Sequence, residues 1–355
     1  MKKQIIYLSA IAFTGSLVFT SCKKYDADET TQYTNQEILT SFSTNVAYGT
    51  YNDLNTKIGE LYTAVQTFNA SSTQSNLVAC RSLWKESRAA WEQSEGFLFG
   101  PVATEDIDPR IDTWPMDSVA LNNVLNSTTT FDEAYINSLD DALRGFHPVE
   151  YILWGANSTK TATEVTAKEK EYLLALAANL KTLIGQLPSQ WELSVSSSYA
   201  STFSAAGNNG IYPTVHAAFI ELASAMAGIC DEVANGKMED PFVAQDPALE
   251  ESPFAKNSII DFTNNITSVE NVYLGKYSTD GKALENFVRA NNLSLDGTIK
   301  TKIANAKQAL ANITVPFGDA ISSQPTQVLA AQTAINELKN VLETDLVLLI
   351  DQKIQ

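Results

Sequence analysis

The sequence predicts an all-α protein built from two helical-bundle domains with long irregular loops. Apolar residues recur every three or four positions along most of the chain, which is the spacing of one face of an α-helix. No segment of the sequence shows the alternation or the short turn signals typical of strands and hairpins. The length of 355 residues exceeds what one hydrophobic core usually organises, so two bundles are expected.

The N-terminal segment is expected to lie outside these bundles. Lys2 and Lys3 precede an apolar stretch that ends in FTSC, which is typical of an export signal over residues 1–21. A cysteine directly after small residues resembles the lipobox of bacterial lipoproteins, so Cys22 is the expected lipidation site. Ordinary secretion with an incidental cysteine is the alternative. Residues 22–34 are polar and lack periodicity, which predicts a flexible tether.

The N-terminal bundle is predicted over residues 35–190. Its first apolar face consists of Ile38, Leu39, Phe42, Val46, Leu54, Ile58, Leu61, Val65 and Phe68. Further helices are predicted at about 73–97, 131–144 and 164–186. The stretch at 98–130 is rich in Pro, Gly and Asp, so it is predicted to be an irregular loop.

The C-terminal bundle is predicted over residues 191–355. Its helices are expected at 211–235, 256–274, 297–312 and 326–354, with an irregular stretch at 237–255. The segments EGFLFG, from Glu95, and ENVYLG, from Glu270, share a glutamate, an apolar run and a glycine at equal spacing. This echo is compatible with an internal duplication.

Charge and targeting signals limit the partners and the compartment. Removal of Lys2 and Lys3 with the signal leaves 22 basic against 41 acidic residues, a formal net charge of −19. This excess of negative charge argues against nucleic acid and anionic lipid surfaces as partners, because both attract basic proteins. The protein is expected to be exported and anchored by its lipid to a bacterial membrane, in the periplasm or at the cell surface. Cys80 and Cys230 are predicted to form either a disulfide or two buried free thiols.

The stretch GFHPVEYILWG contains the first candidate metal ligands. His147 and Glu150 are three residues apart, so a helix would place both side chains on one face. Together they could offer a metal ion an imidazole nitrogen and a carboxylate oxygen. Pro148 is expected at the first helical position, with His147 at the helix entrance. A capping or core histidine beside a solvated glutamate is the alternative.

Further acidic candidates lie upstream, in WEQSEGFLFGPVATEDIDPRIDTWP. Glu95 lies at the end of an aromatic-rich helix, and Asp108 and Asp112 follow, four residues apart. The alternative for the aspartates is turn formation, because Asp-Pro commonly opens a turn. Several carboxylates with one imidazole would form a hard, oxygen-rich site that suits iron or calcium-like ions.

These stretches resemble signatures of the imelysin-like family. GFHPVEYILWG is similar to its GxHxxE motif, and W-x-x-x-E, FGP and IDTWP are similar to its other N-terminal signature. ESPFAKNSIIDFTNNITSVENVYLG and VPFGDAI resemble family segments in the second half, so the resemblance spans nearly the whole chain after the signal. It implies a fold of two helical bundles. In related iron-uptake proteins the pattern E…DxxxD…GxHxxE is thought to form the metal site, which implicates Glu95, Asp108, Asp112, His147 and Glu150.

The resemblance and the acidic residues lead to one leading hypothesis of function and two alternatives. The leading hypothesis is an exported lipoprotein that binds a metal ion or metal chelate, with iron the expected metal, and that works with iron-transport membrane proteins. The first alternative is a zinc metallopeptidase that uses His147 and Glu150 with a metal-bound water, Glu150 being the catalytic candidate, because the family also carries a peptidase label. The second alternative is a surface lipoprotein that binds a partner and no metal.

Two further predictions concern the surroundings of this site. A polar face at helical spacing includes Glu251, Ser252, Asn257, Ser258, Asp261 and Asn264. Of these residues, Ser252, Asn257, Ser258 and Asp261 are expected to form the wall of a cleft at the domain junction. A solvated helix face is the alternative. The second histidine, His216, lies among apolar residues and is predicted to be buried or capping rather than a ligand.

Overall fold

The apolar spacing of the sequence becomes the buried face of each long helix. In the computed structural model, which describes residues 33–354, helix α2 (Gly49–Ala70) buries one predicted face completely. That face consists of Leu54, Ile58, Leu61, Val65 and Phe68, each no more than 1% exposed. Burying a side chain of this size contributes about 1.5–3 kcal/mol, so the regular spacing is sufficient to hold the helix in place.

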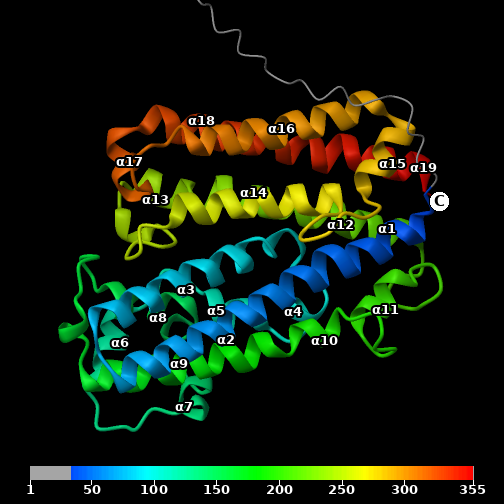
Figure 1. Cartoon of the computed structure of the whole chain (residues 1–355). Helices are drawn as coiled ribbons and strands as arrows, with labels where there is room; N and C mark the ends of the chain where they lie inside the picture. The colour runs from blue at the N-terminus through cyan, green and yellow to red at the C-terminus, as the bar shows by residue number, and fades with distance from the viewer. Residues whose placement is uncertain (1–32, 355) are drawn as a thin grey trace, which may run out of the picture. The chain divides into compact units, whose positions relative to one another are not determined.

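The N-terminal half contains three long helices and several short ones (Figure 1). Its α-helices are α1 (Asn35–Ser41), α2, α3 (Gln74–Glu92), α4 (Pro101–Thr104), α5 (Ile107–Asp112), α6 (Ser118–Leu125), α7 (Glu133–Asn137), α8 (Phe146–Trp154), α9 (Ala167–Gly185) and α10 (Leu187–Gln190). A π-helical segment, η1 (Phe42–Tyr48), joins α1 to α2, and the 3-10 turns are η2 (Glu95–Phe97), η3 (Asp141–Leu143) and η4 (Ala162–Glu164). Helix α2 packs against both α3 and α9.

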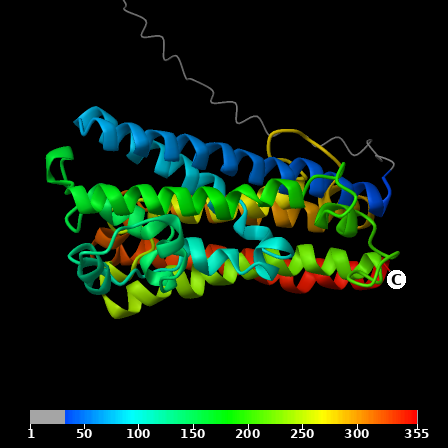
Figure 2. The same ribbon diagram turned by 90° about the horizontal axis from the view of Figure 1, so that it is seen from below.

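The C-terminal half is a second group of long helices. Its α-helices are α11 (Tyr199–Ser204), α12 (Val215–Glu232), α13 (Glu239–Ala244), α14 (Ser258–Leu274), α15 (Leu284–Asn291), α16 (Leu293–Ala311), α17 (Phe317–Ser323), α18 (Pro325–Asn340) and α19 (Val347–Lys353). The segments η5 (Val233–Lys237) and η7 (Val341–Leu346) are π-helical, and η6 (Pro247–Leu249) is a 3-10 turn. Helices α12, α14, α16 and α18 pack against one another, and Figure 2 shows the long helices of both halves running lengthwise.

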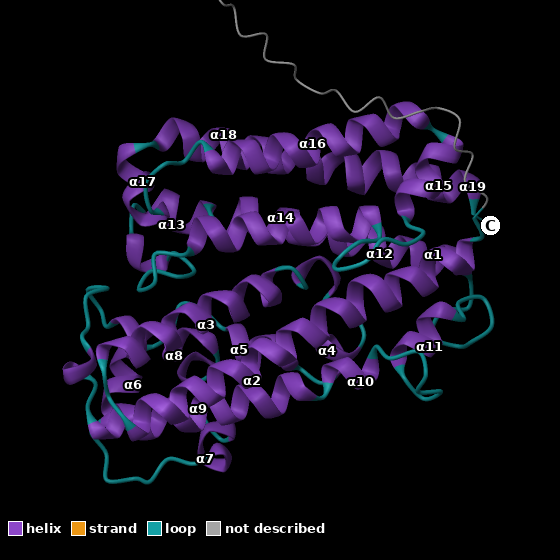
Figure 3. Ribbon diagram, viewed as in Figure 1, coloured by secondary structure: helices purple, strands orange, loops and turns teal. Residues whose placement is uncertain are grey.

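The all-α prediction is confirmed. Figure 3 shows only helices and loops across the described residues, and the sole β feature among them is an isolated bridge between Lys276 and Asp280. None of the helices in that part of the chain has the length and apolar character needed to cross a bilayer. Cys80 and Cys230 are buried free thiols rather than a disulfide.

Three predicted elements differ from the structure, and one of them is the irregular stretch predicted at 237–255, which contains α13 and η6. The helix expected at 131–144 is wrong: the chain forms α7, then a break, then η3, because Asp140 binds the backbone N–H of Ala142 and starts a new turn. The irregular stretch predicted at 98–130 contains α4, α5 and α6. Asp117 begins α6 by accepting from the N–H of Ala120, which is ordinary N-cap chemistry.

The N-terminal predictions lie largely outside the described residues. The export signal at 1–21, the lipidation site at Cys22 and most of the tether at 22–34 fall before Tyr33. The described residues form one compact unit, and the bundle boundary predicted at 190 stays a prediction. Within this unit α3 packs on α14, and η2 packs on both α12 and α14, so the end of α3 lies between the two helical groups.

Candidate metal centre

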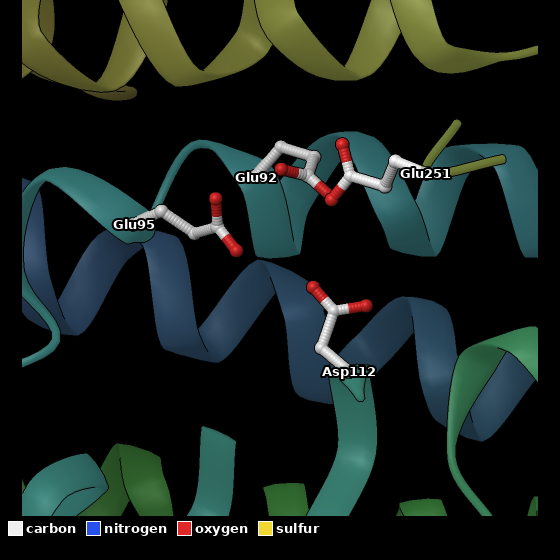
Figure 4. Close-up of side chains that lie close together, drawn as sticks. All are labelled: Glu92, Glu95, Asp112 and Glu251. Carbon is white, nitrogen blue, oxygen red and sulfur yellow. The ribbon is translucent and has the colours of Figure 1, made fainter. Parts of the chain in front are cut away.

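Four carboxylates converge where α3 meets the C-terminal helices. Glu92 is the last residue of α3, Glu95 begins η2, Asp112 ends α5, and Glu251 lies in the segment before α14. One oxygen from each lies within 4.8 Å of one from every other, and Figure 4 shows the four side chains directed at a common point. All four are buried, with Glu95 the most exposed at 6%. We call these four residues the acidic cluster.

Arg88 forms ion pairs with three residues of the acidic cluster. It lies one turn before Glu92 on α3 and is fully buried. Its guanidinium forms ion pairs with Asp112 and Glu92, and its Nη2 atom lies 3.1 Å from Oε1 of Glu251. A planar guanidinium presents several donors in a fixed fork, so a single side chain can bind all three carboxylates.

Lys237 is the second buried basic residue that contacts the acidic cluster. It ends the π-helical segment η5, and its ammonium lies 2.6 Å from Oε1 of Glu251 and 3.0 Å from Oε2 of Glu95. Asn265 of α14 donates from the same side, 2.6 Å from each of Glu92 and Glu95. The four carboxylates of the acidic cluster are therefore contacted by two buried basic side chains, those of Arg88 and Lys237.

His147 connects the acidic cluster to Glu150. Its Nε2 atom lies 3.1 Å from Oδ1 of Asp112, and its Nδ1 atom lies 3.2 Å from Oε2 of Glu150. The other oxygen of Glu150 accepts from the backbone N–H of Ala255 at 2.7 Å, so this pair also ties α8 to the segment before α14. His147 thus lies within reach of Asp112, but it bridges two carboxylates with both ring nitrogens.

The start of α8 differs from the prediction. The helix begins at Phe146, so Pro148 is the third helical residue rather than the first, and His147 is helical. A proline is tolerated here because the N–H groups of the first turn have no acceptor within the helix. The chain enters through Gly145 at φ +86°, where an added Cβ would overlap the carbonyl of Ile111. A glycine is required there to bring His147 close to α5.

The remaining predicted site residues lie around this centre without joining it. Asp108 is half-buried one turn before Asp112 on α5. The residues of the predicted cleft wall are buried, each with no more than 1% of its surface exposed: Ser252, Asn257, Ser258 and Asp261. Asp261 accepts from the amide of Asn257 and lies 3.9 Å from Arg88. This polar face therefore packs toward the acidic cluster in the interior rather than lining an open cleft.

Burial and neighbouring charges shift the pKa values of the cluster in opposite directions. Burial, with the charge of Glu92 added, raises the pKa of Glu95 well above its ordinary value and raises that of Glu251. Burial acts the same way on Asp112, but Arg88 and His147 outweigh it and hold the pKa of Asp112 below its usual range. Carboxyls with a raised pKa retain protons that a cation could replace.

The same balance sets the charge of His147. Burial lowers the pKa of His147, but its contacts with Asp112 and Glu150 outweigh burial and raise it to about 9. At neutral pH the ring is therefore an imidazolium that donates to both carboxylates. To become a direct metal ligand it would first have to lose a proton, because only a neutral imidazole offers a lone pair.

The donor set fits a hard metal ion. Carboxylate oxygens are the preferred ligands of such ions, and four of them converge here from three separate segments of the chain. Within the described residues, Oε2 of Glu251 has no hydrogen-bond partner although it is buried. A buried carboxylate oxygen left in this state costs free energy, which a bound cation would recover.

The second histidine lies elsewhere. His216 is partly exposed at the start of α12, and its Nε2 atom is 2.8 Å from Oδ1 of Asp351. The prediction of a buried or capping His216 is therefore wrong. The apolar neighbours that suggested burial lie on another side of α12, where Phe219 and Leu222 are buried.

Sequence reasoning found Glu95 and Asp112 but missed half of the centre. Glu251 was assigned only to the polar face, and Glu92, Arg88 and Lys237 were not selected. A signal for Arg88 and Glu92 was present, since both fall at helical spacing from Trp84 and Trp91 and so share the buried face of α3. A charged residue on an apolar face is an informative exception.

Comparisons with known proteins agree with this architecture. Residues 47–344 match the peptidase family model described as Imelysin. The chain is 31% identical to iron-regulated protein A of Synechococcus elongatus over 94% of this chain and 90% of that protein.

Two solved structures share the fold. A protein described as an iron-regulated protein A precursor, from Parabacteroides distasonis, is 26% identical with a TM-score of 0.80, covering 90% of this chain and 95% of that one. An imelysin-like protein from Psychrobacter arcticum has a TM-score of 0.71 at 14% identity over 89% of this chain and 95% of that one, a likeness of fold. With its helical fold and its matched length, the chain belongs to the imelysin family.

Proposed function

We propose that this protein binds a metal ion, with iron the expected metal, at the acidic cluster, as a binding component of an uptake system. The observation that carries the proposal is the convergence of four buried carboxylates from separate segments on one point. The four carboxyl groups outnumber the buried basic side chains of Arg88 and Lys237 by two, and burial raises the pKa values of Glu95 and Glu251. A buried excess of negative charge is costly, and a divalent or trivalent cation that displaces protons from these carboxyls would neutralise it.

In this proposal the four carboxylates are the ligands and His147 positions one of them. His147 contacts Oδ1 of Asp112, the oxygen that Arg88 also contacts, and the two contacts together fix the orientation of that carboxylate. Mutation of such outer partners typically lowers metal affinity by about 10- to 100-fold. Glu150 in turn orients the ring of His147 through Nδ1. Asp108 lies one turn away on α5, where burial and the charge of Asp112 raise its pKa to about 7.

The name of the Synechococcus relative supports iron as the first metal to test, because that protein is called iron-regulated. Export, lipid attachment at Cys22 and work beside iron-transport membrane proteins complete the proposal. A chelate of the metal is an alternative cargo. The enclosed position of the acidic cluster favours the bare ion, since all four ligands are buried.

The geometry favours binding over peptide hydrolysis. A zinc peptidase site usually combines two or more histidines with an acid and an open coordination position. Here His147 is the only one of the chain's two histidines near the cluster, and both oxygens of Glu150 are already engaged. Hydrolysis of casein by the purified protein, abolished by a chelator and by Glu150→Gln, would instead support the peptidase alternative.

Calorimetric titration tests the metal proposal. We expect wild-type protein to bind Fe²⁺ under anaerobic conditions, or Fe³⁺ supplied as citrate, with one site per chain. Glu95→Gln removes one anionic ligand at nearly constant shape and should weaken binding by about 10- to 100-fold or more, the range known for losing even an outer partner.

Glu270→Gln is the matched control for this titration. Glu270 occupies the corresponding position in the sequence echo, but it is partly exposed and pairs with Lys307 on the surface of α14. Its variant should bind metal like the wild type. Equal affinity in wild type and Glu95→Gln, or no binding by wild type, contradicts the proposal.

A further inference from the structure

Lys237 occupies the place where a cation would meet the acidic cluster. Its ammonium lies 2.6 Å from Glu251, 3.0 Å from Glu95 and 3.9 Å from Glu92, so it contacts three of the four carboxylates. Metal–carboxylate distances are about 2.0–2.6 Å, so a metal ion bound to these three groups would overlap the ammonium. The metal ion and Lys237 therefore compete for the same oxygens.

The surroundings of Lys237 offer its ammonium a second position. Glu232, at the end of α12, is not part of the acidic cluster, lies 3.6 Å from the ammonium, and has a side chain that is 46% exposed. The ring of Trp114 lies 5.0 Å from the same nitrogen and offers a cation–π contact. A lysine stem has four rotatable bonds, so a small swing can exchange buried carboxylates for Glu232 and Trp114.

The backbone conformation at Lys237 supports a functional role for this side chain. Lys237 is the last residue of η5, a π-helical segment that follows α12 directly. Short π-helical segments inside α-helices are frequent at functional sites because they shift side chains away from the regular helical register. Here the shift places a lysine inside the cluster while Glu232, five residues earlier, remains at the surface.

We propose that Lys237 is a built-in competitor for the metal ion and so determines which cations the site accepts. This inference rests on the proposed metal function. A monovalent cation that displaces the ammonium leaves the charge of the cluster unchanged, so it gains little. A divalent or trivalent cation adds net positive charge among four carboxylates, so it can displace the ammonium toward Glu232 and Trp114. The site therefore rejects Na⁺ and K⁺ and admits multivalent metals.

Charge-changing variants at Lys237 test this role. Lys237→Met removes the ammonium and retains most of the stem, and we expect its affinity for Fe²⁺ and Mn²⁺ to rise by at least about tenfold in calorimetric titration, a change of about 1.4 kcal/mol. We also expect 150 mM Na⁺ to compete with Mn²⁺ measurably in Lys237→Met but not in wild type. Lys237→Arg retains the charge and should show no gain. Lys302→Met, which breaks the exposed pair with Glu337, is the matched control.

Thermal unfolding provides a second readout, because the variant also loses an internal ion pair. Lys237→Met and Lys237→Gln should unfold at lower temperature than wild type without metal, and should show a larger upward shift of Tm when Mn²⁺ is added. If wild type binds metal and neither variant binds it more tightly, the competitor role is overturned while the metal function stands. If only the variants bind, Lys237 blocks the native site and the proposed function fails. If none binds, both proposals are overturned.

Discussion

Replacing Arg88 by methionine is expected to lower the free energy of unfolding by about 3–5 kcal/mol. The guanidinium is fully buried, contacts three carboxylates and lies 5.1 Å from the ring of Phe146. Methionine fills the space of the stem but leaves those carboxylates without their shared partner. Removing one member of a buried ion pair is costly because the other charge then lacks both water and a counterion.

Denaturant unfolding monitored by circular dichroism measures this change. Arg110→Met is the matched control, because Arg110 donates to Asn137 at the surface and its loss should change stability by less than about 0.5 kcal/mol. A loss below about 1 kcal/mol in Arg88→Met would show that the acidic cluster does not depend on this guanidinium.

The second large effect is expected for Asp112→Asn. Oδ2 of Asp112 accepts from the indole N–H of Trp91 at 2.6 Å, while Oδ1 faces both Arg88 and His147. An asparagine amide has one NH₂ group, so in either orientation a donor would point at a donor. We expect a loss of about 3–5 kcal/mol in unfolding free energy, as for other broken buried pairs.

Asp112→Asn should also change the pH dependence of stability. The pKa of His147 is raised in the folded state, to about 9 from an ordinary 6.5. Its stabilising contribution is therefore fully present below about pH 6.5 and is lost as the pH rises through about 9. Without the Asp112 carboxylate the folded pKa falls, so NMR titration of the His147 ring should show a lower value and the alkaline loss should shrink.

Two further variants help to explain the loss of stability expected for Asp112→Asn. Asp117→Asn is the matched control, because Asp117 caps α6 and asparagine caps equally well. The double variant Arg88→Met/Asp112→Asn should lose less stability than the sum of the single changes, because each change removes the partner that the other leaves unpaired. Strict additivity would mean that the two side chains are energetically independent.

The helices were predictable from the sequence because helix formation depends on residues that are close together in the chain. The three- and four-residue spacing through Leu54 and Phe68 requires a helix whatever it packs against, and Pro188 and the acids near residue 169 set the limits of α9. The break within 131–144 depends on a side-chain contact of Asp140 with its own backbone, which competes with a continuing helix and leaves a weak pattern.

Only half of the acidic cluster was predictable, because its residues are brought together by packing between segments that are far apart in the chain. Glu95 and Asp112 were selected among the acidic residues upstream of GFHPVEYILWG and then matched to a family pattern. Arg88 and Glu92, in contrast, form an i, i+4 pair that is indistinguishable in sequence from a common surface pair. Lys237 begins a stretch that was predicted to be irregular. Its role depends on segments that lie 142 positions away in the chain, at Glu95, and therefore on packing alone.

The central claim is that one metal ion binds among Glu92, Glu95, Asp112 and Glu251. Crystals of the protein grown with iron, and measured on both sides of the iron absorption edge, test it most directly. We predict a single strong anomalous peak within about 2.0–2.6 Å of oxygens from these carboxylates, with the Lys237 ammonium moved toward Glu232. Iron density only at the surface, or a cluster still bridged by Lys237 at saturating iron, would contradict the account.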